Sequence, residues 1–165
     1  MKTKSKIILA VIFLALISII VYSILKNNQE VIFNNQVIPK GNTHWHPNIK
    51  IIINNQSITI PNNIGVGTGK IIDLPLSGMG MSPTHTHESD GTIHIENKNP
   101  SLKPETLTLG YFFDVWDKRF DQNCIFDYCS NNGTLKMYVN EKENFEFRDY
   151  IMHDKDKIII EYSSN

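Results

Sequence analysis

The chain has 165 residues, of which 16 are basic and 17 acidic. Lysines 2, 4, 6 and 26 lie in or beside an apolar N-terminal segment, which leaves 12 basic and 17 acidic residues elsewhere. A domain with that acidic excess and no basic stripe repels phosphate backbones, so nucleic acid is excluded as a partner. The missing G-x-S-x-G, P-loop and G-x-G-x-x-G motifs argue against serine hydrolases, nucleotide-dependent enzymes and Rossmann dehydrogenases.

Residues 7–25 are apolar apart from two serines and one tyrosine, and none of them carries a charge. As a helix, this stretch is long enough to span the roughly 30 Å core of a bilayer. A cleaved signal peptide is the alternative, but its apolar part usually covers only ~7–15 residues, and no A-x-A cleavage site follows here. We therefore expect residues 1–26 to be a transmembrane anchor whose residues 7–25 contact the lipid bilayer.

The lysines predict the orientation of this anchor. Three of them precede the apolar segment and favour a cytoplasmic N-terminus, although further lysines after it reduce the contrast. Residues 27–41 are mostly polar and end in a Pro-Lys-Gly break, so we interpret them as a stalk or linker that can add one edge strand. Residues 42–165 then form one extracytoplasmic domain of ordinary size on the outer face of the cell membrane.

Runs of β-branched residues predict the strands of this domain. Residues 48–60 contain two such runs around Asn-Asn-Gln, which is typical of a β-hairpin. Its core-facing residues would be Ile51, Ile53, Ile58 and Ile60. Residues 135–140 and 144–147 repeat the pattern and predict a second hairpin. Further strands are expected at residues 70–74, 92–96 and 157–162.

A short amphipathic helix is expected after Thr108, whose hydroxyl can cap its N-terminus. Apolar residues then recur at helical spacing and form one stripe that can lie across a sheet: Leu109, Phe112, Phe113 and Trp116. We interpret these aromatic residues as core. The predicted fold is α+β and mainly β, with sandwich-like sheets of about six to eight strands and one short amphipathic helix, preceded by one N-terminal transmembrane helix.

Cys124 and Cys129 are separated by four residues. An outward location permits oxidation, so we predict that they form a disulfide that closes a small loop. The alternative is a thiol pair that binds Cu(I) or exchanges electrons, together with His153 or a methionine pair. The spacing differs from the C-x-x-C of redox folds, which favours the disulfide.

Five histidines form two clusters ahead of the predicted helix. His85 and His87 are two residues apart, as are His44 and His46, so each pair projects from one face of an extended chain. A turn-forming sequence after His87 would bring His94 back beside the first pair. Three histidines with an open fourth position are typical of transition-metal sites. We therefore predict a metal site built mainly from His85, His87 and His94, with His44 and His46 as further candidate ligands.

The expected ion is copper or zinc. A face made of imidazoles suits zinc, copper or iron, whereas the thioethers of Met79 and Met81 ahead of the cluster favour copper. The carboxylates of Glu88, Asp90 and Glu96 could hold an imidazole through its other nitrogen, or act as a base beside a metal-bound water.

Other interpretations of the histidines stay open. They could be solvated surface residues, or they could sense pH because clustered imidazoles repel one another once they are protonated. His44 and His46 could simply flank Trp45, with its ring in the core, because a proline follows them. His153 is expected to be structural or exposed.

Four motifs together resemble a family of uncharacterised membrane-anchored or secreted proteins of archaea and bacteria. The family carries H-x-H, I-P-x-x-I-G, H-T-H-D-x-x-G-x-I-H-x-E and L-G-x-F-F-x-x-W, which correspond here to residues 44–46, 60–65, 85–96 and 109–116. The likeness covers residues 42–162 and includes a C-terminal hairpin and a D-x-I-x-I strand. Glu88 replaces the usual Asp, and the cysteine and methionine pairs are not family features. The resemblance implies a shared fold and the grouping of His85, His87 and His94, but no reaction.

Three functions are compatible with this sequence. The first is a non-catalytic metal-binding protein of the cell envelope, with a membrane protein as a candidate partner. The second is a metal-dependent enzyme in which the three histidines hold a reactive water and Glu88 or Glu96 acts as base. The third is a structural or interaction domain, such as an accessory subunit of a membrane complex, whose histidines bind no metal. We favour the first and assign no catalytic residue.

Overall fold

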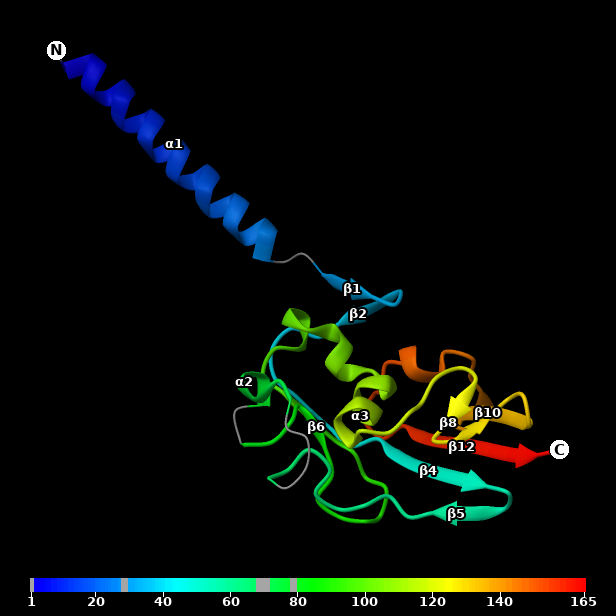
Figure 1. The fold of residues 1–165 in the computed structure, drawn as a ribbon. Coiled ribbons are helices and arrows are strands. Elements are labelled where there is room, and N and C mark those ends of the chain that lie inside the picture. The colour runs from blue at the N-terminus through cyan, green and yellow to red at the C-terminus, as the bar shows by residue number, and fades with distance from the viewer. Residues whose placement is uncertain (1, 28–29, 68–71, 78–79) are drawn as a thin grey trace. The chain divides into compact units, whose positions relative to one another are not determined.

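The structure is a computed structural model that describes residues 2–27, 30–67, 72–77 and 80–165 (Figure 1). The chain divides into two compact units, Met1–Ile32 and Phe33–Asn165. The first contains a single long helix, and the second contains nearly all of the strands and every histidine.

The first unit contains helix α1 (Lys2–Asn27). Within the described residues, its stretch Ile7–Leu25 is the one helix long and apolar enough to cross a membrane. Its described side chains are exposed, as those of a lipid-facing helix are. An N-terminal signal sequence can have the same length and composition. By length and composition, α1 can span a bilayer.

Twelve strands within the described residues form four sheets. The largest has the order β11-β10-β12-β4-β5 and contains β4 (Asn48–Ile53), β5 (Gln56–Ile58), β10 (Gly133–Val139), β11 (Lys142–Glu143) and β12 (Lys157–Ser164). The second has the order β3-β7-β6 and contains β3 (Thr43–Trp45), β6 (Thr84–His85) and β7 (His94–Asn97). Two-stranded sheets pair β1 (Val31–Phe33) with β2 (Gln36–Ile38), and β8 (Cys124–Ile125) with β9 (Tyr128–Cys129).

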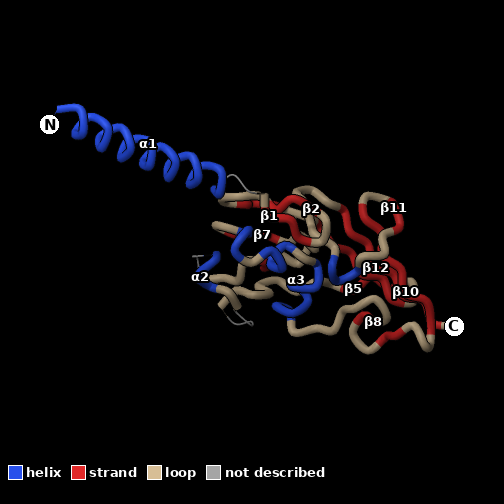
Figure 2. Tube along the Cα trace, turned by 90° about the horizontal axis from the view of Figure 1, so that it is seen from above, coloured by secondary structure: helices blue, strands red, loops and turns tan. Residues whose placement is uncertain are grey.

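The five-stranded sheet supplies much of the core. Strands β4 and β12 lie parallel and side by side at its centre (Figure 1), and the other pairs of neighbouring strands are antiparallel. Figure 2 shows β10, β12 and β5 of this sheet from above. Alternate residues of these two strands point inward and are buried: Ile49, Ile51, Ile53, Ile158, Ile160 and Tyr162. Burial alternates with a period of two because successive side chains of a strand point to opposite faces, and one face of this sheet is covered.

The first predicted hairpin is confirmed. Strands β4 and β5 pair antiparallel around a turn at Asn54 and Asn55, which have φ values of 50° and 64°. Asparagine tolerates this left-handed region better than most residues, and a two-residue turn of this kind matches the twist of a hairpin. Ile51, Ile53 and Ile60 are buried as expected, whereas Ile58 is only partly covered.

The second predicted hairpin is confirmed in its first arm and its turn, but its second arm was placed wrongly. Strand β11 covers only residues 142–143, and residues 144–147 are not a strand. The side chain of Asn144 accepts a hydrogen bond from the backbone N–H of Glu146 at 2.8 Å. Such a local asparagine turn replaces the ladder hydrogen bonds, and the chain continues into the 3-10 helix η3 (Phe147–Asp149).

Helix α3 (Leu109–Trp116) is confirmed with the predicted cap. The Thr108 hydroxyl oxygen accepts a hydrogen bond from the backbone N–H of Tyr111 at 3.2 Å. Leu109, Phe112 and Phe113 are fully buried, and Trp116 is partly buried. The helix contacts β6 and η3, so its apolar stripe covers the part of the fold that carries a predicted ligand, His85.

One predicted strand is wrong in the part that can be compared. Of residues 70–74, residues 70–71 lie outside the described residues, 72–73 are irregular, and Leu74 begins the single helical turn α2 (Leu74–Ser77). Proline at position 75 explains the difference, because it is favoured in the first turn of a helix and disfavoured in a strand. Two 3-10 helices that also contain proline near their start, η1 (Pro100–Leu102) and η2 (Pro104–Leu107), precede α3.

The observed fold confirms the predicted α+β, mainly β class, but its twelve strands within the described residues exceed the predicted six to eight. Strands predominate, they form several sheets, and the helices of note are the apolar α1 and the short α3. The predicted strand at residues 157–162 is β12, and the predicted strand at residues 92–96 is β7, which covers residues 94–97. Cys124 and Cys129 lie opposite each other on β8 and β9 with their sulfurs 2.08 Å apart, as expected for the predicted disulfide.

Candidate metal centre

The candidate site lies on one face of the three-stranded sheet, and β7 is its central strand. On β7, His94 and Glu96 point to one face, while Ile95 between them points to the other and is fully buried. The antiparallel registers place His85 of β6 opposite His94, and His44 of β3 opposite Glu96. Directly opposed residues in a sheet have neighbouring side chains. Two segments far apart in the sequence therefore deliver histidines to both sides of His94.

His46 and His87 complete the cluster from just beyond the strand ends. The ring centroid of His46 lies 4.8 Å from that of His94. The ring centroid of His87 lies 4.8 Å from that of His85 and 4.6 Å from that of His94. The structure therefore brings together all five histidines that the sequence pointed to.

Three of these histidines, His85, His87 and His94, form a group that we call the inner triad. One ring nitrogen from each lies within 4.8 Å of the others, which is a spacing that could hold a metal ion. The Nε2 atoms of His85 and His87 are 3.2 Å apart. Two nitrogens bound tetrahedrally at 2.0–2.1 Å from one ion would be roughly 3.3 Å apart, so this pair already has the separation of a chelate.

His85 is held in the form that a metal requires. It is fully buried, and its Nδ1 donates to the backbone carbonyl of Ser82 at 2.9 Å. That bond places the ring proton on Nδ1 and leaves the lone pair of Nε2 facing His87. Burial lowers the pKa of His85 to about 4, against the opposing effect of the Ser82 carbonyl, so the ring is neutral at pH 7. Only a neutral imidazole can ligate an ion.

His94 carries the one unsatisfied buried side-chain atom among the described residues. Its Nδ1 is buried and has no hydrogen-bond partner there. Burial lowers the pKa of His94, and the neighbouring His87 and His46 lower it further, so this ring also favours its neutral form. A buried polar atom without a partner typically costs about 1–3 kcal/mol. A metal ion or a water at this position would remove that penalty.

The second group, His44, His46 and His94, is called the outer triad below. One ring nitrogen from each again lies within 4.8 Å of the others. The side chains of His44 and His46 are 65% and 40% exposed, in contrast to fully buried His85. Carboxylates accompany both: Glu96 Oε1 lies 3.2 Å from His44 Nε2, and Asp154 Oδ1 lies 3.9 Å from His46 Nδ1. Asp154 also accepts the backbone N–H of His46 at 2.9 Å.

The predicted reversal between His87 and His94 is present and is fixed to β4. Asp90 Oδ1 accepts the backbone N–H of Thr92 at 2.8 Å, and Gly91 adopts a φ of 84°. The backbone N–H of Ile49 donates to the Gly91 carbonyl at 2.8 Å. A Cβ on Gly91 would collide with the Ile49 carbonyl oxygen. Glycine is therefore required here both by the backbone angle and by the close approach of β4.

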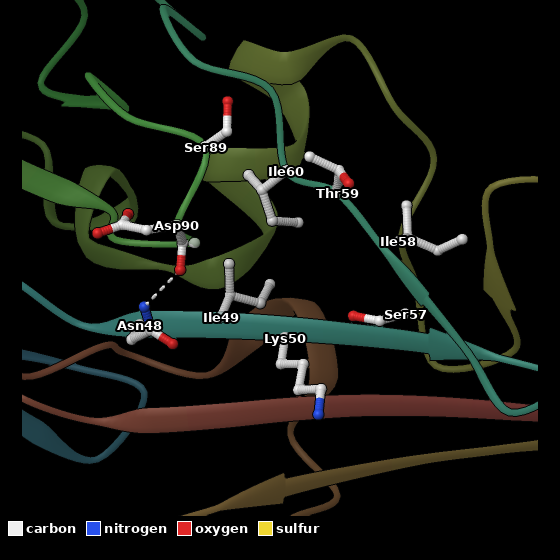
Figure 3. A pocket seen from close by; sticks show the side chains of 10 residues that line it. Asn48, Ile49, Lys50, Ser57, Ile58, Thr59, Ile60, Ser89 and Asp90 are labelled. Carbon is white, nitrogen blue, oxygen red and sulfur yellow. Dashed lines mark hydrogen bonds between the residues drawn. The ribbon is translucent and has the colours of Figure 1, made fainter.

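A hollow of about 280 Å³ lies beside this turn, and Figure 3 shows its lining. Among the lining residues, the Asn48 side chain donates a hydrogen bond to the Asp90 carbonyl at 3.1 Å (Figure 3). Its described lining consists of three isoleucines, one lysine, one aspartate, one glycine and four small polar residues, and it contains no histidine. This hollow is thus a feature of the packing between the turn and the sheet rather than part of the candidate centre.

The three predicted carboxylates have different surroundings. Glu96 faces His44 as described, Asp90 stabilises the turn through backbone hydrogen bonds, and Glu88 is exposed on that turn. Met79 lies outside the described residues, and Met81 is buried with its backbone paired to Val66, so the two methionines do not favour copper over zinc. The groups with metal-binding spacing among the described residues contain histidines alone.

The sequence did not reveal the residues that position the histidine strand. The Thr86 hydroxyl donates to the Pro61 carbonyl at 2.9 Å and accepts the backbone N–H of Ile64 at 3.0 Å. The backbone N–H of Ser82 donates to the Gly65 carbonyl at 2.9 Å. Residues 60–65, which the sequence presents only as a motif, therefore hold Thr86 and Ser82 on either side of His85. Their proximity to a histidine segment 20 residues later has no local signal in the sequence.

His153 lies outside both triads. Its ring stacks on Trp45 with the centroids 5.8 Å apart, and its Nδ1 is 3.6 Å from Asp156 Oδ2. Trp45 is partly buried, and the expectation that its ring lies in the core is met only in part.

Comparison with protein-family models, curated proteins and solved structures finds no match to this chain.

Proposed function

We propose that this chain is a membrane-anchored protein of the cell envelope that binds one transition-metal ion through His85, His87 and His94. The observation that carries the proposal is that the inner triad already has the nitrogen spacing and the neutral, oriented imidazole that binding an ion requires. His85 is buried, neutral and held by the Ser82 carbonyl with its Nε2 3.2 Å from that of His87. His94 adds a buried nitrogen that has no partner in the described residues. Fully solvated histidines would show neither feature.

Zinc or copper is the proposed ion. Neutral imidazoles are borderline ligands that suit both, and three of them leave a fourth position open. His87 is exposed, so the proposed site is reachable from solvent, and a water or a ligand atom of a partner could complete the coordination of a bound ion. The Glu96 carboxylate lies 3.2 Å from His44 Nε2, beside the site, and a carboxylate there favours the approach of a cation.

We further propose that α1 remains as a single-pass anchor and that the second unit lies outside the cell. The length of the apolar run and the lysines before it support this orientation. The Cys124 and Cys129 disulfide also supports it, because such bonds persist in oxidising compartments. Membership of the archaeal and bacterial family that the motifs resemble, and a membrane protein as partner, are further proposals.

The test is the metal content of the untagged full-length protein, purified in detergent from alkaline-washed membranes. Recovery at full length from washed membranes is the result expected for a retained anchor. Mass spectrometry should then find nearly one zinc or copper per chain, and the triple variant His85→Ala, His87→Ala, His94→Ala should have lost it. The matched control is His153→Ala, since that histidine lies outside both triads and should not affect metal content. Equal trace metal in all three proteins, even after reconstitution, would refute the metal site.

A further inference from the structure

The two triads share His94, and this sharing has a functional consequence. We propose that the outer triad is the position through which the ion is taken up and handed on, so that a single ion moves between the outer and inner triads by way of His94. This inference rests on the proposed function, because it needs an ion in the inner triad. The chain then exchanges its ion with a partner or with solution, in addition to binding it.

The sheet register creates the path. His94 lies on the central strand, with His85 opposite it on one side, and β3 delivers His46 to the other side. The ring of His94 is 4.8 Å from that of His46 and 4.6 Å from that of His87, measured between centroids. An ion could therefore exchange ligands one at a time, since His94 can stay bound while the histidines of one triad replace those of the other.

The outer histidines are more exposed than the inner ones, so the ion enters and leaves at the outer triad. The side chains of His44 and His46 are 65% and 40% exposed, His94 is partly buried, and His85 is fully buried. A hollow of about 250 Å³ borders His44 and Glu96, so an incoming ligand or side chain has room at the outer end. The outer triad is thus the accessible, rapidly exchanging position, and the inner triad is the position that retains the ion.

Charge favours one ion over two. The ligands of both triads are imidazoles, which are neutral when they bind. Among the described residues, the carboxylates within ion-pair distance of the five histidines are Glu96 and Asp154, both beside the outer pair. A neutral imidazole offers one lone pair, so His94 can bind only one ion at a time, and two divalent ions held this close together would also repel each other. The two positions are therefore alternatives for one ion. Both can be occupied in turn, but not together.

A competing route exists through His87, the exposed ligand of the inner triad. An ion that arrived there directly would not need His44 or His46. The two routes make opposite predictions for a variant that lacks only the outer pair, because that variant keeps the whole inner triad. Both residues are at least 40% exposed on their side chains, so their removal leaves the core intact.

The experiment uses Zn²⁺ with the full-length protein in detergent and measures stoichiometry, affinity and the rate of transfer to a fluorescent chelator. We expect one Zn²⁺ per chain in the wild type and in His44→Ala/His46→Ala, with transfer in that variant slower by roughly tenfold or more. His153→Ala should behave as the wild type. His85→Ala/His87→Ala should bind Zn²⁺ weakly and exchange it fast, since it keeps only the outer triad.

A second readout locates the ion in the outer triad. Trp45 lies between His44 and His46 in the sequence, and Trp116→Phe makes it the one tryptophan of the chain. Paramagnetic Cu²⁺ bound by His85→Ala/His87→Ala in that background should quench Trp45 fluorescence, and a further His44→Ala/His46→Ala change should abolish the quenching.

Three results would overturn the inference in different ways. Unchanged transfer rates in His44→Ala/His46→Ala would show that ions use the His87 route. Two Zn²⁺ ions per wild-type chain would show that the positions fill independently. In both cases the proposed function stands, because the inner triad still binds its ion. A wild type that binds no Zn²⁺ would instead refute the proposed function, and the inference with it.

Discussion

Single hydrogen bonds hold the histidines and one buried carboxylate of this protein in defined states. The Ser82 carbonyl determines which nitrogen of His85 carries the proton, and Glu96 lies within ion-pair distance of His44. Asp156 has a similar role near the C-terminus, where it accepts hydrogen bonds from the Tyr150 hydroxyl at 2.7 Å and the Asn140 amide at 2.8 Å.

Asp156 should make folding sensitive to acid. Burial alone would raise its pKa, but hydrogen bonds from His153, Tyr150 and Asn140 outweigh that effect and lower the pKa to about 2. A group whose pKa is lower in the folded protein stabilises it above the unfolded pKa of roughly 4, and this stabilisation is lost as the pH falls toward 2. The group is only 6% exposed, so the effect should reach about 2 kcal/mol.

The measurement is urea unfolding of the wild type and Asp156→Asn between pH 5 and pH 2. The variant should be less stable at pH 5, and the difference between the two proteins should shrink by about 2 kcal/mol at pH 2. A difference that stays constant with pH would mean that Asp156 titrates alike in the folded and unfolded chain.

At the scale of elements, turns decide whether the histidines meet. Strand β7 can pair with β6 only because the chain reverses tightly between His87 and His94, and the Gly91 carbonyl fastens that reversal to Ile49 of β4. Hairpins elsewhere use asparagine pairs for the same purpose, with Asn54 and Asn55 as the clearest case. The geometry of the candidate centre therefore depends on a glycine that is not itself a ligand.

Replacing Gly91 by alanine should destabilise the second unit by about 3 kcal/mol or more, because the new Cβ meets the Ile49 carbonyl oxygen at an unfavourable backbone angle. Gly41→Ala is the matched control, since Gly41 also has a positive φ but its new methyl group would have no atom within 4 Å among the described residues. That change should reduce stability by only about 1 kcal/mol. Thermal or urea unfolding measures both, and equal losses would show that the contact with β4 is unimportant.

At the scale of the whole molecule, the second unit places three distant segments on one sheet. Strands β3, β6 and β7 come from residues 43–45, 84–85 and 94–97, and each carries or precedes a histidine of the cluster. An ion bound by the inner triad would link β6, the turn after it and β7. Binding should therefore stabilise the folded unit as a whole, because the unfolded chain does not hold these segments together.

Metal should accordingly raise the melting temperature. At a free Zn²⁺ concentration of a hundred times its Kd, the expected gain is about 2.7 kcal/mol, which for a domain of this size corresponds to several degrees. Differential scanning calorimetry with Zn²⁺, and again after EDTA, measures the shift and its reversal. The triple variant of the inner triad should show no shift, and a shift equal to that of the wild type would place the ion elsewhere.

The sequence alone determined those features that depend on local pattern. Residues 7–25 could only be an apolar helix of membrane-spanning length, the period of two in residues 48–53 required a half-buried strand, and Thr108 with its aromatic stripe specified α3. The grouping of His85, His87 and His94 also followed from local spacing and a recognisable turn. Where local signals conflicted, as with Pro75 and Asn144, the predicted strands were wrong.

Only the tertiary structure decided that His44 and His46 join the same cluster, that His85 is buried against the Ser82 carbonyl, and that His94 is shared by two triads. These facts depend on strand order and register. A register of β3 on β7 shifted by one residue would turn both outer histidines to the opposite face. Register is set by packing of the whole core, which no short stretch of sequence contains.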